Sequence, residues 1–180
     1  MPPALQEIID FFEHLPEPER RENLIDIAET SSAFTKKAGQ TYLIEDVRKD
    51  QECSDTVGVF LQLDLAGRVH FAIELGPKVQ TLTRAMTAIL CRGLNGCTAD
   101  EILAVPSDFV PRIIGADLVR LRSHTVYYVL NRMKQAVEKA IIAMPSTIGV
   151  RCRAKISGFS ASGVRSRSSS RSTRSRGALM

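Results

Sequence analysis

Two runs of alternating apolar residues near the middle of the chain constrain its fold most. The first run is Val57, Val59, Leu61, Leu63 and Leu65, and the second is Val69, Phe71, Ile73 and Leu75. A period of two places one side of a β-strand in a core and leaves the other side more polar. Ala66-Gly67 supplies a turn between the runs, so the sequence predicts a β-hairpin over residues 57–75. Because two strands alone are only marginally stable, other elements must cover the apolar face of this hairpin.

Helical periodicity surrounds the hairpin on both sides. Apolar spacing predicts helices over residues 5–12, 18–28, 79–94, 106–114 and 122–144. Thr98 and Glu101 form a capping box and predict a further short helix. Residues 29–55 lack a sustained period and are predicted to be a long connection, apart from a third strand over residues 40–47. Helices around a small antiparallel sheet of about three strands predict an α+β fold.

The C-terminal segment differs in composition from the rest of the chain. Eight of the 24 basic residues lie beyond residue 150, where no acidic residue occurs, so residues 1–150 carry 16 basic and 20 acidic side chains. A Ser/Arg-rich segment cannot bury enough apolar surface to fold. We therefore expect a domain over residues 1–145 and a disordered basic tail over residues 146–180. An RNA-binding or phosphorylatable arm is one interpretation of the tail, but the acidic body favours a dispensable extension, and nucleic acid is not an expected partner.

The N-terminal segment and the apolar runs bear on location. No apolar run approaches the roughly 18 residues that a membrane-spanning helix needs. The opening segment MPPALQEIIDFFEHL has no basic residues before its apolar positions, so neither a secretory signal nor a basic transit peptide is indicated. A cytoplasmic protein without membrane contact is expected. In that compartment the four cysteines are not expected to form structural disulfides.

Cys53 is the cysteine whose surroundings most suggest chemistry. Glu52, Ser54 and Asp55 flank it, and a thiol among charged neighbours cannot be buried without burying their charges as well. Cys53 is therefore either an incidental surface residue or a nucleophile at a loop tip. Because exposed thiols are prone to oxidation, the nucleophile is the sharper hypothesis.

The other thiols and the histidines give weaker signals. Cys91 and Cys97 miss the ligand spacing of a zinc site and the three histidines are scattered singly, so no metal is expected. A Cys–His hydrolase is a minor alternative, since no histidine lies in a recognisable motif. Cys91 continues an apolar helix face and is expected to be a packed thiol. Cys97 lies at a helix entry that could lower its pKa, although packing is favoured there too.

The order of these motifs resembles the SufE family, the sulfur-accepting partners of cysteine desulfurases in iron–sulfur cluster assembly. The resemblance spans residues 5–142. It is carried by LPEPERRENLIDIAE, by Cys53 four residues before Val57, and by GPKVQTLTRAMTAIL, GCTADEIL and LRSHTVYYVLNRMKQAV. The chain departs from the family at Gly58, where the family usually has tryptophan, and at Thr125, where its last helix usually has glycine.

The resemblance implies a SufE/IscU-like fold and a sulfur-relay protein that is not itself an enzyme. Cys53 would accept persulfide sulfur from a SufS-like cysteine desulfurase, stimulate that enzyme and deliver the sulfur to a SufBCD-like iron–sulfur scaffold complex. Arg122 carries over as a supporting residue, and the resemblance implies no resident cofactor. The alternative is an IscU-like cluster scaffold, which would hold iron and sulfide on three cysteines. A homodimer is left open.

The charges around Cys53 raise a specific question. Glu52 and Asp55 would raise the pKa of its thiol by like-charge repulsion, whereas sulfur transfer needs the thiolate. A basic group must therefore offset these two carboxylates. The candidates are Arg48, Lys49 and Arg122.

Overall fold

The computed structural model describes residues 1–49 and 55–143, and it describes residues 121–126 by their backbone alone. The described residues all belong to one compact unit, Met1–Pro145. Cys53 and the predicted tail over residues 146–180 lie outside the described residues. Among the described helices, none combines the length and the apolar character that crossing a membrane would require.

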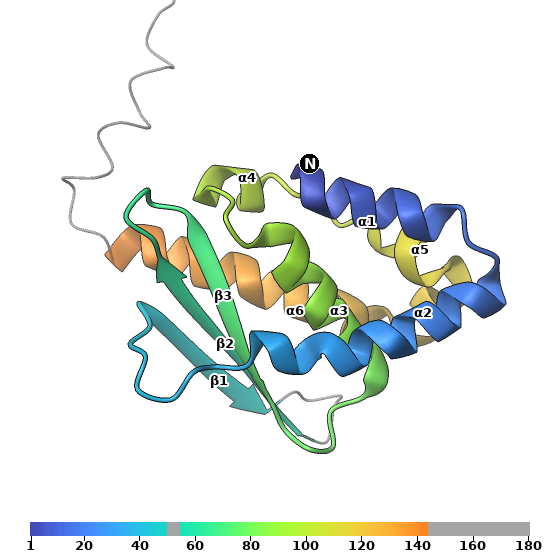
Figure 1. Ribbon diagram of the computed structural model, residues 1–180, viewed down its shortest axis with the longest axis horizontal. Helices are drawn as coiled ribbons and strands as arrows, with labels where there is room; N and C mark the ends of the chain where they lie inside the picture. The colour runs from blue at the N-terminus through green and yellow to red at the C-terminus, as the bar shows by residue number, and fades with distance from the viewer. Residues whose placement is uncertain (50–54, 144–180) are drawn as a thin grey trace, which may run out of the picture. The chain divides into compact units, whose positions relative to one another are not determined.

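Helices pack beside a small sheet in this unit (Figure 1). In chain order the elements are α1 (Pro3–Glu13), α2 (Glu17–Glu29), the 3-10 helix η1 (Thr30–Phe34), β1 (Ile44–Lys49), β2 (Thr56–Leu63), β3 (Val69–Leu75), α3 (Thr81–Leu94), α4 (Ala99–Leu103), α5 (Val110–Ile114) and α6 (Ala116–Ala143). The predicted α+β fold with a three-stranded antiparallel sheet is confirmed.

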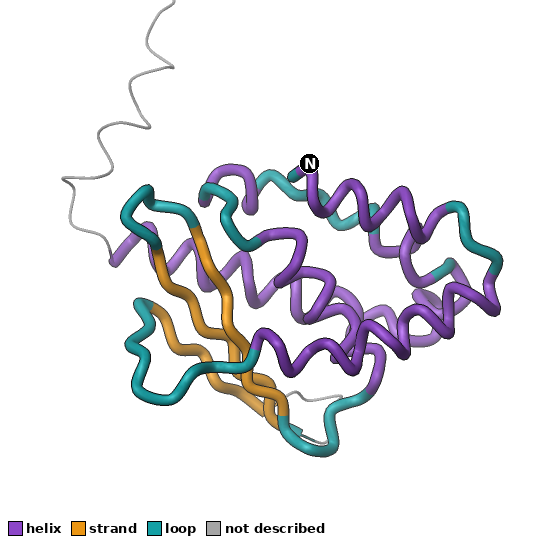
Figure 2. The backbone as a smooth tube through the Cα atoms, in the orientation of Figure 1, coloured by secondary structure: helices purple, strands orange, loops and turns teal. Residues whose placement is uncertain are grey.

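The strands lie in the order β1-β2-β3, and both neighbouring pairs are antiparallel, so β2 is central (Figure 2). The predicted hairpin is confirmed as β2 and β3, but β2 ends before Leu65, which is fully exposed. The alternation stops there because the Asp64 carboxylate accepts hydrogen bonds from the backbone of Ala66 (2.9 Å) and Arg68 (2.8 Å). These two bonds close the turn one residue before Leu65 could continue the strand.

Several predicted bounds differ from the structure, and the helix predicted over residues 106–114 is observed as the shorter α5, Val110–Ile114. The strand predicted over residues 40–47 is observed as Ile44–Lys49, and Tyr42 lies outside it with its ring against that of Phe60, at 5.3 Å between centroids. The connection predicted over residues 29–55 contains the 3-10 helix η1. The last helix begins at Ala116 rather than near residue 122, directly after Gly115, whose positive φ of 86° ends α5.

Helix α3 is the centre of the hydrophobic core. It contacts α1, α2, α6 and β3, and its buried side includes Met86, Ile89 and Leu90. Gly93 allows α1 to approach closely, because an added Cβ would lie 2.9 Å from the Cβ of Leu5. Helices α3 and α6 together cover the sheet face that carries the predicted apolar alternation.

The opposite face of the sheet carries a smaller cluster around Phe60. This ring is fully buried and packs against Tyr42, and the Lys36 ammonium lies 4.5 Å from its centroid. A Cβ placed on Gly58 would lie 2.8 Å from the Phe60 ring. The departure from the SufE pattern at position 58 therefore has a packing reason: Phe60 occupies the space beside Gly58 that a large side chain there would need.

Other segments hydrogen-bond the outer edge of β3. The Lys36 N–H donates to the Ile73 carbonyl (2.9 Å), the Phe71 N–H donates to Asn95 Oδ1 (2.7 Å), and Val69 pairs with Gly96 and Cys97 (both 2.8 Å). The side-chain amide of Asn95 thus replaces the peptide group of a neighbouring strand. This edge of the sheet is closed, and β1 forms the other edge in the described part of the chain.

Candidate functional site

The predicted site residues fall at the limits of what the structure describes. Cys53 lies outside the described residues, and Arg122 lies in α6 at a position described by backbone alone. The chain on both sides of Cys53 is described: Lys49 ends β1, Thr56 begins β2, and the two are opposite each other in the sheet. The candidate site therefore consists of the described groups that hold the ends of these two strands.

Asp55 fixes the chain at the start of β2. Its Oδ1 accepts a hydrogen bond from the Thr56 N–H (2.8 Å), and its Oδ2 accepts one from the Lys78 N–H (2.6 Å). These backbone donors, Lys78 first and then Thr56, hold the pKa of the Asp55 carboxyl below its usual range. Asp55 is the second residue after Cys53 in the sequence, so the first described residue after Cys53 is attached to the turn after β3.

That turn is itself held by Arg84 of α3. The guanidinium donates from Nε to the Val79 carbonyl (3.1 Å) and from Nη2 to the Gly76 carbonyl (2.9 Å). Gly76 leaves room for the Asp55 carboxyl group, which would collide with any Cβ at that position. The turn thus requires a glycine here for steric reasons, and it connects Asp55 to the helical core.

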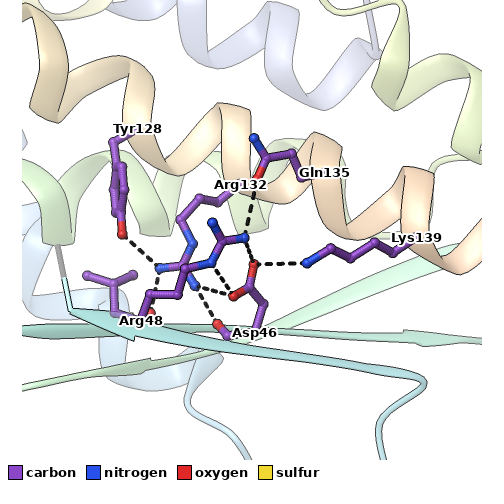
Figure 3. A network of polar contacts seen from close by, with 7 residues as sticks. Asp46, Arg48, Tyr128, Arg132, Gln135 and Lys139 are labelled. Atoms are coloured by element: carbon purple, nitrogen blue, oxygen red, sulfur yellow. Dashed lines mark hydrogen bonds and ion pairs between the residues drawn. The ribbon is translucent and has the colours of Figure 1, made fainter.

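Charged side chains of β1 and α6 form a network beside the other strand end (Figure 3). Asp46 lies at its centre and is only 6% exposed. Its carboxylate accepts a two-pronged hydrogen bond from Arg48 and lies 3.2 Å from Arg132 Nη2 and 3.7 Å from Lys139 Nζ. Gln135 accepts a further hydrogen bond from Arg48 (3.3 Å). Arg48, one of the three candidates to offset the charges around Cys53, is therefore engaged with Asp46.

Arg132 joins both strands to α6. It is 2% exposed, its Nη1 donates to the Val57 carbonyl of β2 (2.5 Å), and its Nη2 donates to the Asp46 carbonyl of β1. Nη1 also lies 3.2 Å from the Tyr128 hydroxyl, and the guanidinium carbon lies 5.3 Å from the centre of that ring. One buried side chain therefore binds the backbone of β1 and of β2 close to their paired ends.

Among the described side chains, the network carries more positive than negative charge. Three cations, Arg48, Arg132 and Lys139, surround the carboxylate of Asp46. The hydrogen bond from Arg48, followed by the charges of Arg132, Arg48 and Lys139, holds the pKa of the Asp46 carboxyl below its usual range. The Arg48 and Lys139 side chains are about half exposed, so the excess charge reaches the surface.

Sequence reasoning missed Asp46 and Arg132. One signal for Arg132 was available, because it lies among the apolar positions Val129, Met133 and Ala136 of α6, on the helix side that faces the core. An arginine on such a side is buried only when it is paired. Asp46 gave no comparable signal, because an acid within a short strand is usually solvated.

The two described cysteines are not activated thiols. Cys91 is fully buried in α3, as predicted, and burial raises the pKa of its thiol far above the usual range. Burial, and then the charge of Glu101, raise the pKa of Cys97. The helix entry therefore does not lower the pKa of Cys97, and packing is its role. Among the described residues there is no group of three or more histidine, cysteine, aspartate or glutamate side chains that could hold a metal.

A hollow of about 420 Å³ opens between α2, η1 and the end of β3. Its lining includes the apolar side chains of Ile25, Ile73 and Leu75 and the charged side chains of Glu74 and Arg84. Arg84 is the residue that also holds the turn to which Asp55 is attached. The hollow thus adjoins one of the two attachments that flank Cys53.

Two solved structures share the fold. One is the solution structure of a hypothetical protein from Thermus thermophilus, with a TM-score of 0.63, 22% identity, and coverage of 79% of this chain and 98% of that one. The other is the crystal structure of the N-terminal part of a nitrogen-fixing NifU-like protein from Brucella abortus, with a TM-score of 0.50, 17% identity, and coverage of 64% and 92%. These likenesses define a class of small α+β domains with this sheet and helix arrangement.

The family model described as "SufE: Fe-S metabolism associated domain" matches residues 6–137. The chain belongs to the SufE family, and its role lies in iron–sulfur metabolism. A search of curated proteins finds no match. The family resemblance seen in the sequence is therefore confirmed over nearly the whole described domain.

Proposed function

We propose that this protein is a sulfur acceptor and carrier that takes persulfide sulfur from a cysteine desulfurase onto Cys53. The observation that carries the proposal is the SufE match over residues 6–137, which includes the cysteine between β1 and β2. The attachments on either side of that cysteine support it. Asp55 ties one flank to the β3 turn, and Arg132 ties β1 and β2 to α6.

The proposed reaction is a thiol–persulfide exchange. The Cys53 thiolate attacks the terminal sulfur of the persulfide on the desulfurase cysteine, and a new S–S bond forms at Cys53. The S–S bond of the donor breaks, and its cysteine leaves as a thiolate. One sulfur atom moves and no external oxidant or reductant is used. Cys53 then carries a persulfide for delivery to an iron–sulfur scaffold complex.

The environments of the other described cysteines support the choice of Cys53. Attack requires a thiolate that can reach a donor on another protein. Cys91 is fully buried and its pKa is strongly raised, so it meets neither requirement. Cys97 is partly buried, its pKa is raised, and its thiol lies 3.8 Å from the Gly93 carbonyl.

The proposal assigns partners but no resident cofactor. A SufS-like cysteine desulfurase is the sulfur donor and a SufBCD-like scaffold complex is the recipient, both in the cytoplasm. This protein acts as an accessory that stimulates the desulfurase by removing its persulfide, rather than as an enzyme. Arg122 is proposed as a supporting residue of Cys53. The division into a SufE-like domain over residues 1–145 and a tail over residues 146–180 stays a prediction.

Mass spectrometry after incubation with a cysteine desulfurase and cysteine tests the proposal. We expect one added sulfur on Cys53, and we expect Cys53→Ser to abolish both this sulfur and the stimulation of desulfurase turnover. Cys97→Ser is the matched control and should behave like the parent. Sulfur on Cys97 with none on Cys53, or a Cys53→Ser variant that stimulates like the parent, would overturn the proposal.

The alternative of an IscU-like cluster scaffold is tested in parallel by reconstitution with iron and sulfide. A scaffold would acquire the visible absorption of a cluster, whereas a sulfur carrier stays colourless. Fold likeness to the NifU-like structure does not separate the two, because a shared fold does not determine function. A coloured, cluster-bearing protein would replace the proposal with the alternative.

A further inference from the structure

We infer that Arg132 is a positioning residue for sulfur transfer, because it holds together the strand ends between which the proposed acceptor cysteine lies. The inference rests on the proposed function and extends it to a residue to which the resemblance to SufE sequences assigns no role. The contacts of Arg132 itself are made with described residues of β1, β2 and α6 (Figure 3).

The first observation is the location of the Arg132 bonds. Its guanidinium reaches the Val57 carbonyl, one residue into β2, and the Asp46 carbonyl, three residues before the end of β1. Five residues, 50–54, separate Lys49 from Asp55 in the sequence. Arg132 therefore fixes both strands near the places where this segment leaves and rejoins the sheet.

The second observation is that this arrangement is a costly way to hold a sheet. Burying a guanidinium and a carboxylate requires desolvation of both charges, and well-packed apolar residues of similar volume are often at least as stabilising. Arg132 Nε is also buried without a hydrogen-bond partner among the described residues. Buried donors of this kind cost free energy. Stability alone therefore gives a poor account of Arg132, whereas directional bonds to two backbone carbonyls account for it well.

The third observation is the attachment at the opposite flank. Asp55 binds the Lys78 N–H, and Arg84 holds that turn against α3. The described chain on the two sides of residues 50–54 is thus held by Arg132 of α6 and by the bond from Asp55 to the turn before α3. Loss of either attachment should disturb how the cysteine is presented, rather than how strongly the protein binds its sulfur donor.

Single-turnover sulfur transfer tests this inference with the full chain and a purified cysteine desulfurase loaded with persulfide. The measured quantities are the maximal transfer rate and the concentration of this protein at half saturation. Arg132→Met keeps the length of the side chain but removes its donors, and Arg132→Lys keeps a cation and can form one of the two carbonyl bonds. Arg112→Met is the matched control, because Arg112 pairs with Glu13 in a surface contact between α5 and α1.

We expect Arg132→Met to lower the maximal rate about tenfold, the scale of a modest loss of alignment, with half saturation changed less than twofold. Arg132→Lys should recover most of the rate, and Arg112→Met should match the parent. If Arg132→Met does not fold by circular dichroism, Asp46→Asn replaces it, since it preserves shape and weakens the hold on Arg132. Asp46→Asn should lower the maximal rate about threefold.

Three results would overturn the inference. The first is a folded Arg132→Met variant, or the Asp46→Asn variant used in its place, that keeps the parental maximal transfer rate. The second is a change in the half-saturating concentration alone. The third is an Arg112→Met variant whose maximal transfer rate falls as much as that of Arg132→Met. In each case a parent protein that still gains sulfur on Cys53 leaves the proposed function standing. A parent that gains no sulfur on Cys53 overturns both the function and the inference.

Discussion

Replacing Asp46 by alanine should destabilise the fold strongly, because it leaves the Arg132 guanidinium buried without its counter-charge. Arg132 is 2% exposed and lies 3.2 Å from the Asp46 carboxylate. At an effective dielectric constant of about 20, a charge pair at this separation interacts by roughly 5 kcal/mol before desolvation is counted. Removing one partner of a buried pair typically costs about 3–5 kcal/mol. The half-exposed partners Arg48 and Lys139 should each add no more than about 1 kcal/mol.

Urea unfolding followed by circular dichroism measures this loss. With a denaturant slope of about 2 kcal/mol per molar, a loss of about 3 kcal/mol lowers the midpoint by roughly 1.5 M. The double variant Asp46→Ala/Arg132→Met should lose less than the sum of the two single variants, because no buried charge is then left alone. A loss below about 1 kcal/mol for Asp46→Ala, or additive single losses, would refute this reasoning.

The pH dependence of stability gives an independent check on the same group. Hydrogen bonding by Arg48 and the nearby cations lower the pKa of Asp46 in the folded state below its value of about 3.9 in the unfolded chain. Its contribution to stability is therefore fully present above pH 4 and is lost as the pH falls through the lower folded value. The gap in unfolding free energy between the parent and Asp46→Asn should be constant from pH 8 to 5 and should narrow below pH 4. A gap that stays constant to pH 2 would contradict the assignment.

Three further predictions concern other contacts of the domain. Gly76→Ala should displace the Asp55 carboxyl group, so the urea unfolding midpoint of this variant should fall as much as that of Asp55→Ala. The double variant should be no less stable than either single variant, and additive losses of stability would contradict the steric argument. Cys91 should resist iodoacetamide at pH 8 in the native protein and react only in urea, and rapid native labelling detected by mass spectrometry would be inconsistent with its burial. Thr98→Ala should cost about 1 kcal/mol in urea unfolding because the N-cap of α4 loses its side-chain acceptor, whereas Thr98→Ser should keep most of the stability; equal losses would argue against the cap.

Regular periodicity explains why much of the fold could be predicted from the sequence. The hairpin alternation placed β2 and β3, and the capping box placed α4, because both patterns are local. The start of α6 could not be located in this way. Residues 116–121 begin a helix directly after the positive φ of Gly115. Leu118 and Val119 there are only partly buried, whereas the buried apolar residues described in α6 begin at Val129.

The site was less accessible to sequence reasoning than the fold. Cys53 was singled out by its charged neighbours, and Asp55 was interpreted only as a charge that opposes a thiolate. The structure shows that Asp55 is also an attachment, because its carboxylate binds a backbone amide of a turn 23 residues away. Contacts of this kind between distant segments, such as the hydrogen bond from Arg132 to the Val57 carbonyl, produce no periodic pattern in a single sequence.

The closed outer edge of β3 limits how copies of this chain can associate. A strand from another molecule can extend a sheet only where backbone donors and acceptors are free, and exposed edges are where misfolded chains join. Asn95, Lys36 and the segment at Gly96-Cys97 already use those groups along β3. In the described part of the sheet an added strand would therefore pair with β1, whose exposed residues include the charged Glu45 and Lys49 and the apolar Val47 between them. Hydrogen bonding therefore closes one side of the described sheet to a further strand, whereas on the other side only the charges of Glu45 and Lys49 flank the exposed Val47.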